Sequence, residues 1–136
     1  MPARSKSRKR ALDILYAAEL RGQDPVAELD AAIARDEGPT NPYTADLVRG
    51  VAAHREQIDA LLATYSQAWT LERMPAIDRN ALRIGVLELL YVDEVPPVVA
   101  VSEAVSLVRN LSTDESPAFV NGVLGAMLRD RESLTP

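Results

Sequence analysis

The stretch "AIDRNALRIGVLELLYV", residues 76–92, carries apolar side chains on nearly every side of the helix that its spacing predicts. A helix that is apolar all round is stable only when other elements cover it on several sides. We therefore expect residues 76–92 to form the most enclosed helix of the chain. Four charged residues interrupt the pattern and each needs an explanation: Asp78, Arg79, Arg83 and Glu88.

The two segments that follow also predict helices. Residues 95–112, "VPPVVAVSEAVSLVRNLS", start with a β-branched run but continue at helical spacing, which favours a helix from about Pro97. Residues 116–132, "SPAFVNGVLGAMLRDRE", place Ser116 as the N-cap and Pro117 at the first helical position. We expect the small residues of this last helix to let another helix approach closely: Gly122, Gly125 and Ala126.

The segments that precede residues 76–92 follow the same rules. A first helix after the basic start of the chain is expected to end at Gly22, and a second, residues 24–38, begins with Asp24 and Pro25 and stops at Gly38. Residues 42–66 form one long helix or two stacked ones. The connector over 68–75 contains a short helical turn from Thr70 to Arg73, and Trp69 and Met74 fill gaps in the core.

The sequence thus predicts an all-α fold, a single-domain bundle of about seven helices. A chain of 136 residues fits one domain, and we find no internal repeat, low-complexity segment or strand alternation. The chain shows neither the apolar run of a secretory signal nor a membrane span, so we expect a cytoplasmic protein that contacts no membrane.

Catalysis finds little support in the residues. The chain has no cysteine, and His54 is its only histidine, so thiolate sites, catalytic triads and histidine metal sites lack their components. No dinucleotide fingerprint or phosphate-binding loop occurs. Carboxylates scattered on helix faces are usually solvated, and nothing marks any pair as catalytic. We predict that the protein is not an enzyme and holds no cofactor or metal.

Charge is distributed unevenly along the chain. Residues 1–10 hold five cations and no acid, whereas residues 11–136 hold 10 basic and 20 acidic residues. The five cations form a basic N-terminal arm that leads into the first helix: Arg4, Lys6, Arg8, Lys9 and Arg10. Cations at a helix N-terminus oppose the helix dipole, and an anionic ligand there relieves this repulsion.

Nucleic acid is the partner that this arm favours, ahead of an anionic membrane, an acidic protein or no partner at all. The following helix lacks the Trp and Phe face of a membrane anchor. The cations do not lie on the second helix of a helix-turn-helix pair, which argues against reading of duplex DNA. Single-stranded RNA is the most economical partner.

Two further groups are candidates for a binding surface. The start of the last helix offers backbone N–H groups to a phosphate and the Phe119 ring to a base, although Ser116 and Pro117 could equally cap the helix while Phe119 enters the core. Asp78 and Arg79 lie near a helix start, where we expect them exposed and available to a partner. Arg83 and Glu88 are expected to form buried pairs, for instance Arg83 with Glu103.

Four segments together resemble the NusB family of bacterial transcription antitermination factors: "SRKRALDILYAAEL", "PAIDRNALRIGVLELLY", "VPPVVAVSEAVSLVRNLS" and above all "SPAFVNGVLGAMLRD". The resemblance implies an all-helical domain over residues 5–132, made of two packed helical halves, without catalysis. It also implies binding of the boxA element of nascent ribosomal RNA together with NusE, a small-subunit ribosomal protein. The resulting RNA polymerase complex, with other Nus factors, suppresses termination; a homodimer of the free protein remains open.

Site residues follow from the resemblance by position. The basic start matches an arginine-rich RNA-binding segment, Tyr16 lies where a tyrosine supports the RNA and NusE surface, and Asp78 matches an acidic residue on the NusE side. The RNA-binding set is Arg4, Lys6, Arg8, Lys9, Arg10, Tyr16, Glu115, Ser116 and Phe119, and the NusE set is Tyr16, Asp78 and Arg79. Glu115 would repel phosphate, so it tunes affinity rather than supplying it. The alternative function is a helical protein–protein adaptor without direct RNA recognition.

Overall fold

Helices make up the regular structure of the computed structural model, which describes residues 3–35 and 41–135 and shows no strand within these ranges. The helices are α1 (Ala3–Leu20), α2 (Pro25–Ala34), α3 (Pro42–Ala53), α4 (Arg55–Tyr65), α5 (Ala76–Tyr91), α6 (Pro97–Leu111), α7 (Ser116–Arg129) and α8 (Arg131–Leu134). The all-α prediction is confirmed, with eight helices in the described ranges instead of about seven. None of these helices combines the length and the apolar character needed to cross a lipid bilayer.

The chain divides into two compact units, with the boundary between His54 and Arg55. The same boundary answers the question left open for residues 42–66. They form two helices, because α3 ends at Ala53, where the backbone N–H of His54 still donates to the carbonyl of Gly50 at 3.0 Å, and α4 begins at Arg55. This division agrees with the two helical halves that the family resemblance implies.

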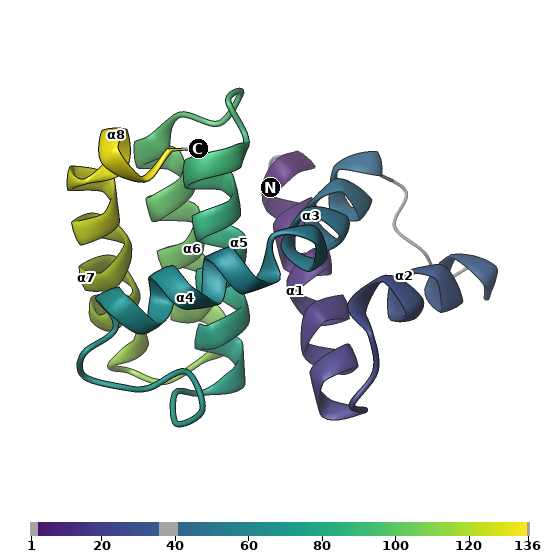
Figure 1. The fold of residues 1–136 in the computed structure, drawn as a ribbon. Coiled ribbons are helices and arrows are strands. Elements are labelled where there is room, and N and C mark those ends of the chain that lie inside the picture. Colours follow the sequence, from purple (N-terminus) through teal and green to yellow (C-terminus); the bar gives the residue numbers. More distant parts are fainter. Residues whose placement is uncertain (1–2, 36–40, 136) are drawn as a thin grey trace. The chain divides into compact units, whose positions relative to one another are not determined.

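In the first unit, α1, α2 and α3 all contact one another (Figure 1). Gly22 ends α1 as predicted, because it adopts the left-handed φ of 61° that only glycine takes without strain. The carboxylate of Asp24 then accepts a hydrogen bond of 3.1 Å from the Ala27 N–H and starts α2. The helix that we predict to stop at Gly38 ends at Ala34, and residues 36–40 lie outside the described ranges.

In the second unit, α5 contacts α4, α6, α7 and α8, and Figure 1 shows α5, α6 and α7 side by side. Twelve of the 16 residues of α5 are buried, so the prediction of an enclosed helix is confirmed. Gly85 of α5 lies close to side chains of both α6 and α7. A methyl group added there would lie 2.7 Å from Leu124 Cδ1 and 3.2 Å from Ala104 Cβ.

The small-residue face predicted for the last helix is wrong. A methyl group at Gly122 would meet no atom within 4 Å, and one at Gly125 would meet only the end of the Arg129 side chain, at 3.9 Å. These two glycines therefore do not mediate close helix packing. The glycine that lies close to α6 and α7 is Gly85 of α5. The sequence pattern did not single it out, because Gly85 has the same helical spacing as the apolar residues around it.

The buried Arg83 of α5 pairs with an acidic residue of α4. The Arg83 guanidinium, with its side chain only 5% exposed, donates from Nε and Nη2 to the two carboxylate oxygens of Asp59 at 2.9 and 3.1 Å. Its Nη1 donates to Asn80 Oδ1 at 3.1 Å, and Arg55 donates to the same carboxylate of Asp59. The expected ion pair of Arg83 is thus found, with Asp59 as one of its partners.

Candidate nucleic-acid interface

The predicted basic arm is helical from Ala3 onward, so its cations occupy the first two turns of α1. Arg4, Lys6 and Lys9 are exposed and Arg10 is half-buried. Arg8 is different, because its residue is only 4% exposed. No acidic residue lies in the first turn to offset the positive end of the helix dipole, which leaves this end of α1 suited to an anion.

Contacts with α3 fix the start of α1. The Thr44 hydroxyl donates a buried hydrogen bond of 3.2 Å to the Ser7 carbonyl, and the Arg4 guanidinium lies 4.9 Å from the centre of the Tyr43 ring. This cation–π contact holds Arg4 against an aromatic face while its residue stays exposed. The cations are therefore presented by a packed helix.

Tyr16 lies on the same face of α1 as Lys9, because seven residues correspond to almost two full turns. Tyr16 is half-buried. Asp13 lies between Lys9 and Tyr16 along the helix, and its carboxylate forms an ion pair of 3.4 Å with Lys9. The face thus combines a ring with an accessible ammonium group.

The start of α7 is organised around a buried serine rather than an open cap. Glu115 occupies the N-cap position, without a side-chain hydrogen bond, and Ser116 is the first helical residue, so the predicted N-cap is wrong by one position. The Ser116 hydroxyl is fully buried, accepts from the Thr113 N–H at 3.2 Å and donates to the Ser112 hydroxyl at 3.1 Å. Ser116 is therefore not available to a ligand in this arrangement, whereas Glu115 is exposed.

Asp78 continues this chain of hydroxyl groups into α5. Its Oδ1 accepts a hydrogen bond of 2.6 Å from the Ser112 hydroxyl, and the residue is 0% exposed. The expected exposure of Asp78 is wrong for this reason. The carboxylate holds the loop between α6 and α7 in place instead of offering itself to a partner.

Arg79 holds a second loop, the segment 66–75 between α4 and α5. Arg79 is half-buried rather than exposed as expected, and its guanidinium donates from Nη1 to the carbonyls of Leu71 and Met74 at 2.5 and 3.1 Å. The backbone N–H groups of Arg73 and Met74 both donate to the Thr70 carbonyl at 3.0 Å, so the predicted helical turn is present as a single hydrogen-bonded turn. Met74 fills the core as predicted, with 3% exposure.

Phe119 and Trp69 are half-buried and belong to no part of the buried core, so the prediction that Trp69 fills a core gap is wrong. The Phe119 ring packs edge-to-face against the ring of Trp69, with centroids 4.8 Å apart and planes at 66°. Sequence reasoning missed this pair, because 50 residues separate the two rings and each taken alone has the pattern of a gap-filling aromatic.

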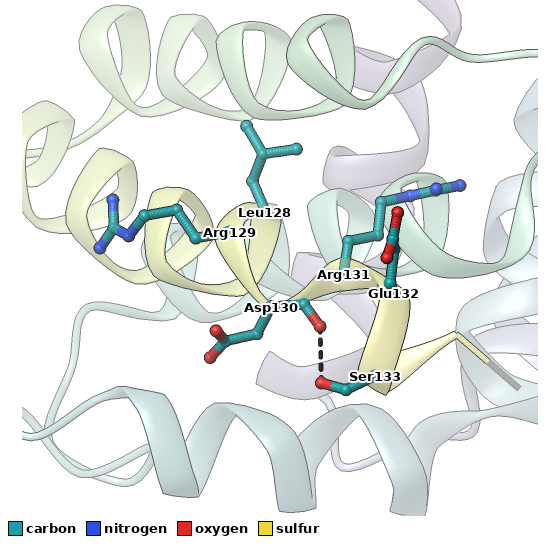
Figure 2. A pocket seen from close by; sticks show the side chains of 6 residues that line it. All are labelled: Leu128, Arg129, Asp130, Arg131, Glu132 and Ser133. Atoms are coloured by element: carbon teal, nitrogen blue, oxygen red, sulfur yellow. Dashed lines mark hydrogen bonds between the residues drawn. The ribbon is translucent and has the colours of Figure 1, made fainter.

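A pocket of about 450 Å³ lies elsewhere in the second unit, at the junction of α7 and α8, and residues 128–133 line it. Figure 2 shows the Arg129 and Arg131 side chains pointing in opposite directions. The Asp130 carboxylate accepts a hydrogen bond of 2.6 Å from Tyr65, which raises the pKa of the tyrosine hydroxyl. The charged groups therefore do not converge on a ligand, and none of the predicted site residues lies here.

Within the described ranges, no group of three or more histidine or acidic side chains is arranged to bind a metal ion.

Relatives of the chain define a class of protein, the transcription antitermination proteins. A relative from Nocardioides sp., a transcription antitermination protein NusB, is 65% identical over 134 residues, which cover 98% of this chain and 99% of the relative. The solved structure of T. maritima NusB matches with a TM-score of 0.84 and 28% identity over 96% of this chain and 93% of that one. A solved complex of the antitermination factors NusB and NusE with double-stranded RNA matches with a TM-score of 0.80 and 28% identity over 93% and 96%.

The model of the NusB family matches residues 5–129, which is most of the sequence. The chain belongs to the NusB family.

Proposed function

We propose that this protein is a transcription antitermination factor that binds the boxA element of nascent ribosomal RNA together with NusE. It acts in the cytoplasm within an RNA polymerase complex that contains other Nus factors, and it carries out no catalysis. The observation that carries this proposal is the set of accessible cations on the first two turns of α1, in a chain of the NusB family. A matching family structure contains NusB, NusE and RNA, which supports the same partners here.

Electrostatics supports α1 as the RNA contact. RNA phosphates neutralise cations that the helix dipole otherwise disfavours. Residues 11–136 carry ten more acidic than basic residues, so much of the chain repels a polyanion. Of the predicted set, Arg4, Lys6, Lys9 and Arg10 contact phosphates, with Tyr16 beside them.

The other predicted residues divide by burial. Glu115 and Phe119 are accessible and belong to the RNA-contacting set, whereas Arg8 and Ser116 act by holding the helices that carry the contacts. On the NusE side, Tyr16 and Arg79 are the half-buried candidates. Asp78 is buried, and we assign it the role of holding the loop between α6 and α7.

The test is a titration of fluorescently labelled RNA, with NusE present, comparing boxA with a scrambled single strand and with a duplex. Deletion of residues 1–10 is unsuitable, because it removes the buried Ser7 and Arg8 from α1. The double variant Lys6→Gln and Lys9→Gln removes two exposed charges and leaves the helix intact. We expect it to weaken boxA binding at least several-fold.

A matched control removes the same net charge elsewhere. Arg109 and Arg129 are exposed on α6 and α7, and Arg109→Gln with Arg129→Gln should leave boxA affinity nearly unchanged. If the control weakened binding as much as the α1 variant, only net charge would matter and the α1 assignment would fail. If the wild-type protein did not prefer boxA over scrambled RNA, the protein–protein adaptor function would replace the proposed one.

A further inference from the structure

A loop and the start of a helix in the second unit meet at one aromatic pair, Trp69 and Phe119. Trp69 lies in the segment between α4 and α5, and Phe119 lies in the first turn of α7. Both rings are half-buried, so each keeps part of its surface in contact with solvent. Trp69 belongs to none of the sets of binding residues that the sequence predicts.

Asp78 and Arg79, consecutive residues of α5, hold the loop that carries Trp69 and the loop that leads into the helix of Phe119. Arg79 donates to two carbonyls of the Trp69 loop, and the Ser66 hydroxyl donates to the carbonyl of Trp69 itself. Asp78 accepts from Ser112, whose hydroxyl accepts from Ser116 at the start of the helix that carries Phe119. Hydrogen bonds therefore anchor the backbone next to both rings before any ligand binds, which lowers the entropy lost on binding.

The charges beside the rings select the kind of group that fits. Glu72, Asp114 and Glu115 are exposed on the two loops, against one exposed cation in the same segments, Arg73. Phosphate groups are disfavoured in such surroundings, whereas the uncharged face of a base is not. Unpaired bases stack on aromatic rings with little dependence on charge or on sequence.

We propose that Trp69 and Phe119 form a stacking site for one unpaired base of the bound RNA, with Trp69 as a direct base contact. This proposal rests on the proposed RNA-binding function and adds a residue and a mode of contact to it. Asp78 and Arg79 are positioning residues for this site, since each acts on a ring only through the loop that it holds.

The sequence offers a direct measurement, because Trp69 is the only tryptophan of the chain. Titration with unlabelled boxA RNA should quench or shift the fluorescence of Trp69, and a strand with an abasic nucleotide at the stacked position should bind without this change. Anisotropy of labelled RNA measures binding independently of the tryptophan. A set of strands, each with one abasic nucleotide, identifies the stacked base.

Substitutions test the energetic contribution. Trp69→Leu keeps an apolar side chain but removes the ring, and we expect it to weaken boxA binding about tenfold, in the lower half of the range for loss of one base stack. Trp69→Phe retains a ring and should lose less than Trp69→Leu. Val98→Ala truncates an apolar side chain that is 64% exposed on α6 and should leave the affinity unchanged.

The outcomes separate this proposal from the function on which it rests. If boxA binds with unchanged Trp69 fluorescence and Trp69→Phe and Trp69→Leu retain full affinity, the stacking site is refuted while RNA binding stands. If NusE alone, without RNA, changes the fluorescence by the same amount, the pair belongs to a protein interface and the proposal is overturned. If the labelled RNA does not bind at all, both proposals fail. Should Trp69→Leu not fold, the abasic strands and Trp69→Phe decide.

Discussion

Asp59 of α4 and Arg83 of α5 form a bidentate ion pair, in which the arginine is buried and the aspartate side chain is 26% exposed. Removal of one partner from a fully buried pair costs about 3 to 5 kcal/mol, because the other charge stays buried and uncompensated. Because Asp59 is partly exposed, we expect the loss for Asp59→Ala to lie near the lower end of this range, so that the free energy of unfolding falls by about 3 kcal/mol. In contrast, Asp30→Ala breaks the exposed ion pair with Arg49 and should change the free energy of unfolding by less than about 0.5 kcal/mol. Urea unfolding at pH 7 compares the two variants, and equal losses would contradict this account of Arg83.

The same pair predicts a loss of stability in acid. Burial raises the pKa of Asp59, but hydrogen bonds from Arg83 and Arg55 and the charges of both guanidiniums outweigh it, so the pKa lies below the ordinary value of 3.8. A carboxylate with a lowered pKa in the folded state stabilises the fold above its unfolded pKa, and this contribution is lost as the pH falls through the folded pKa. Urea unfolding from pH 7 to below 3.8 should therefore show a steeper loss for the wild-type protein than for Asp59→Asn. Parallel curves would mean that Asp59 does not contribute in this way.

Burial of single residues was predictable only where the cause is local. Arg8 precedes the buried Leu12 and Leu15 by four and seven residues, so helical spacing places it on the buried face, although its charge suggested an exposed contact. Asp78 gave no such signal. Its burial depends on Ser112, 34 residues away, and on the loop that Ser112 and Ser116 form, which no local pattern describes.

At the scale of helices, Gly85 and Gly122 make a matched pair, because both lie inside helices and only one of them has close neighbours. Alanine gains about 1 kcal/mol over glycine in helix propensity. At Gly122 nothing opposes this gain, so Gly122→Ala should raise the free energy of unfolding by up to about 1 kcal/mol. At Gly85 the new methyl group would clash with the buried Leu124 and with Ala104, and we expect a net loss of about 1 to 2 kcal/mol. Thermal and urea unfolding measure both changes, and a stabilising Gly85→Ala would show that α5, α6 and α7 tolerate a wider separation.

The predictability of the helices follows from the same distinction between local and distant causes. Proline and capping residues mark the starts of α2 and α3 in the sequence, and the apolar pattern marks α5, so their existence was predicted correctly. The sequence left open whether residues 42–66 form one helix or two, because the break falls at His54 and neither proline nor glycine marks it. Gly50, the only glycine of residues 42–66, lies inside α3 and does not end it.

At the scale of the molecule, charge and aromatic rings belong to different units. Residues 1–54 contain eight basic and eight acidic residues, with five of the bases within the first ten, whereas residues 55–136 contain seven basic and 12 acidic residues. The cations proposed to contact RNA all lie in the first unit, and the two rings proposed to stack a base lie in the second. The sequence reveals the first group through its composition, but the second depends on tertiary structure.

This division predicts two separable contributions to RNA binding. For a single strand, the logarithm of the association constant falls with the logarithm of the salt concentration by about 0.7 per phosphate contact, so the four accessible cations of α1 give a slope of about 3. Lys6→Gln with Lys9→Gln should lower this slope to about 1.5, because two contacts are lost. Trp69→Leu should weaken binding equally at every salt concentration and leave the slope unchanged, since a stacked base releases no counterions. Anisotropy titrations of labelled boxA RNA at four or more NaCl concentrations measure both quantities. A slope that stays near the wild-type value in the lysine variant, or that falls in the tryptophan variant, would contradict the assignment of phosphate contacts to α1 and of a base contact to Trp69.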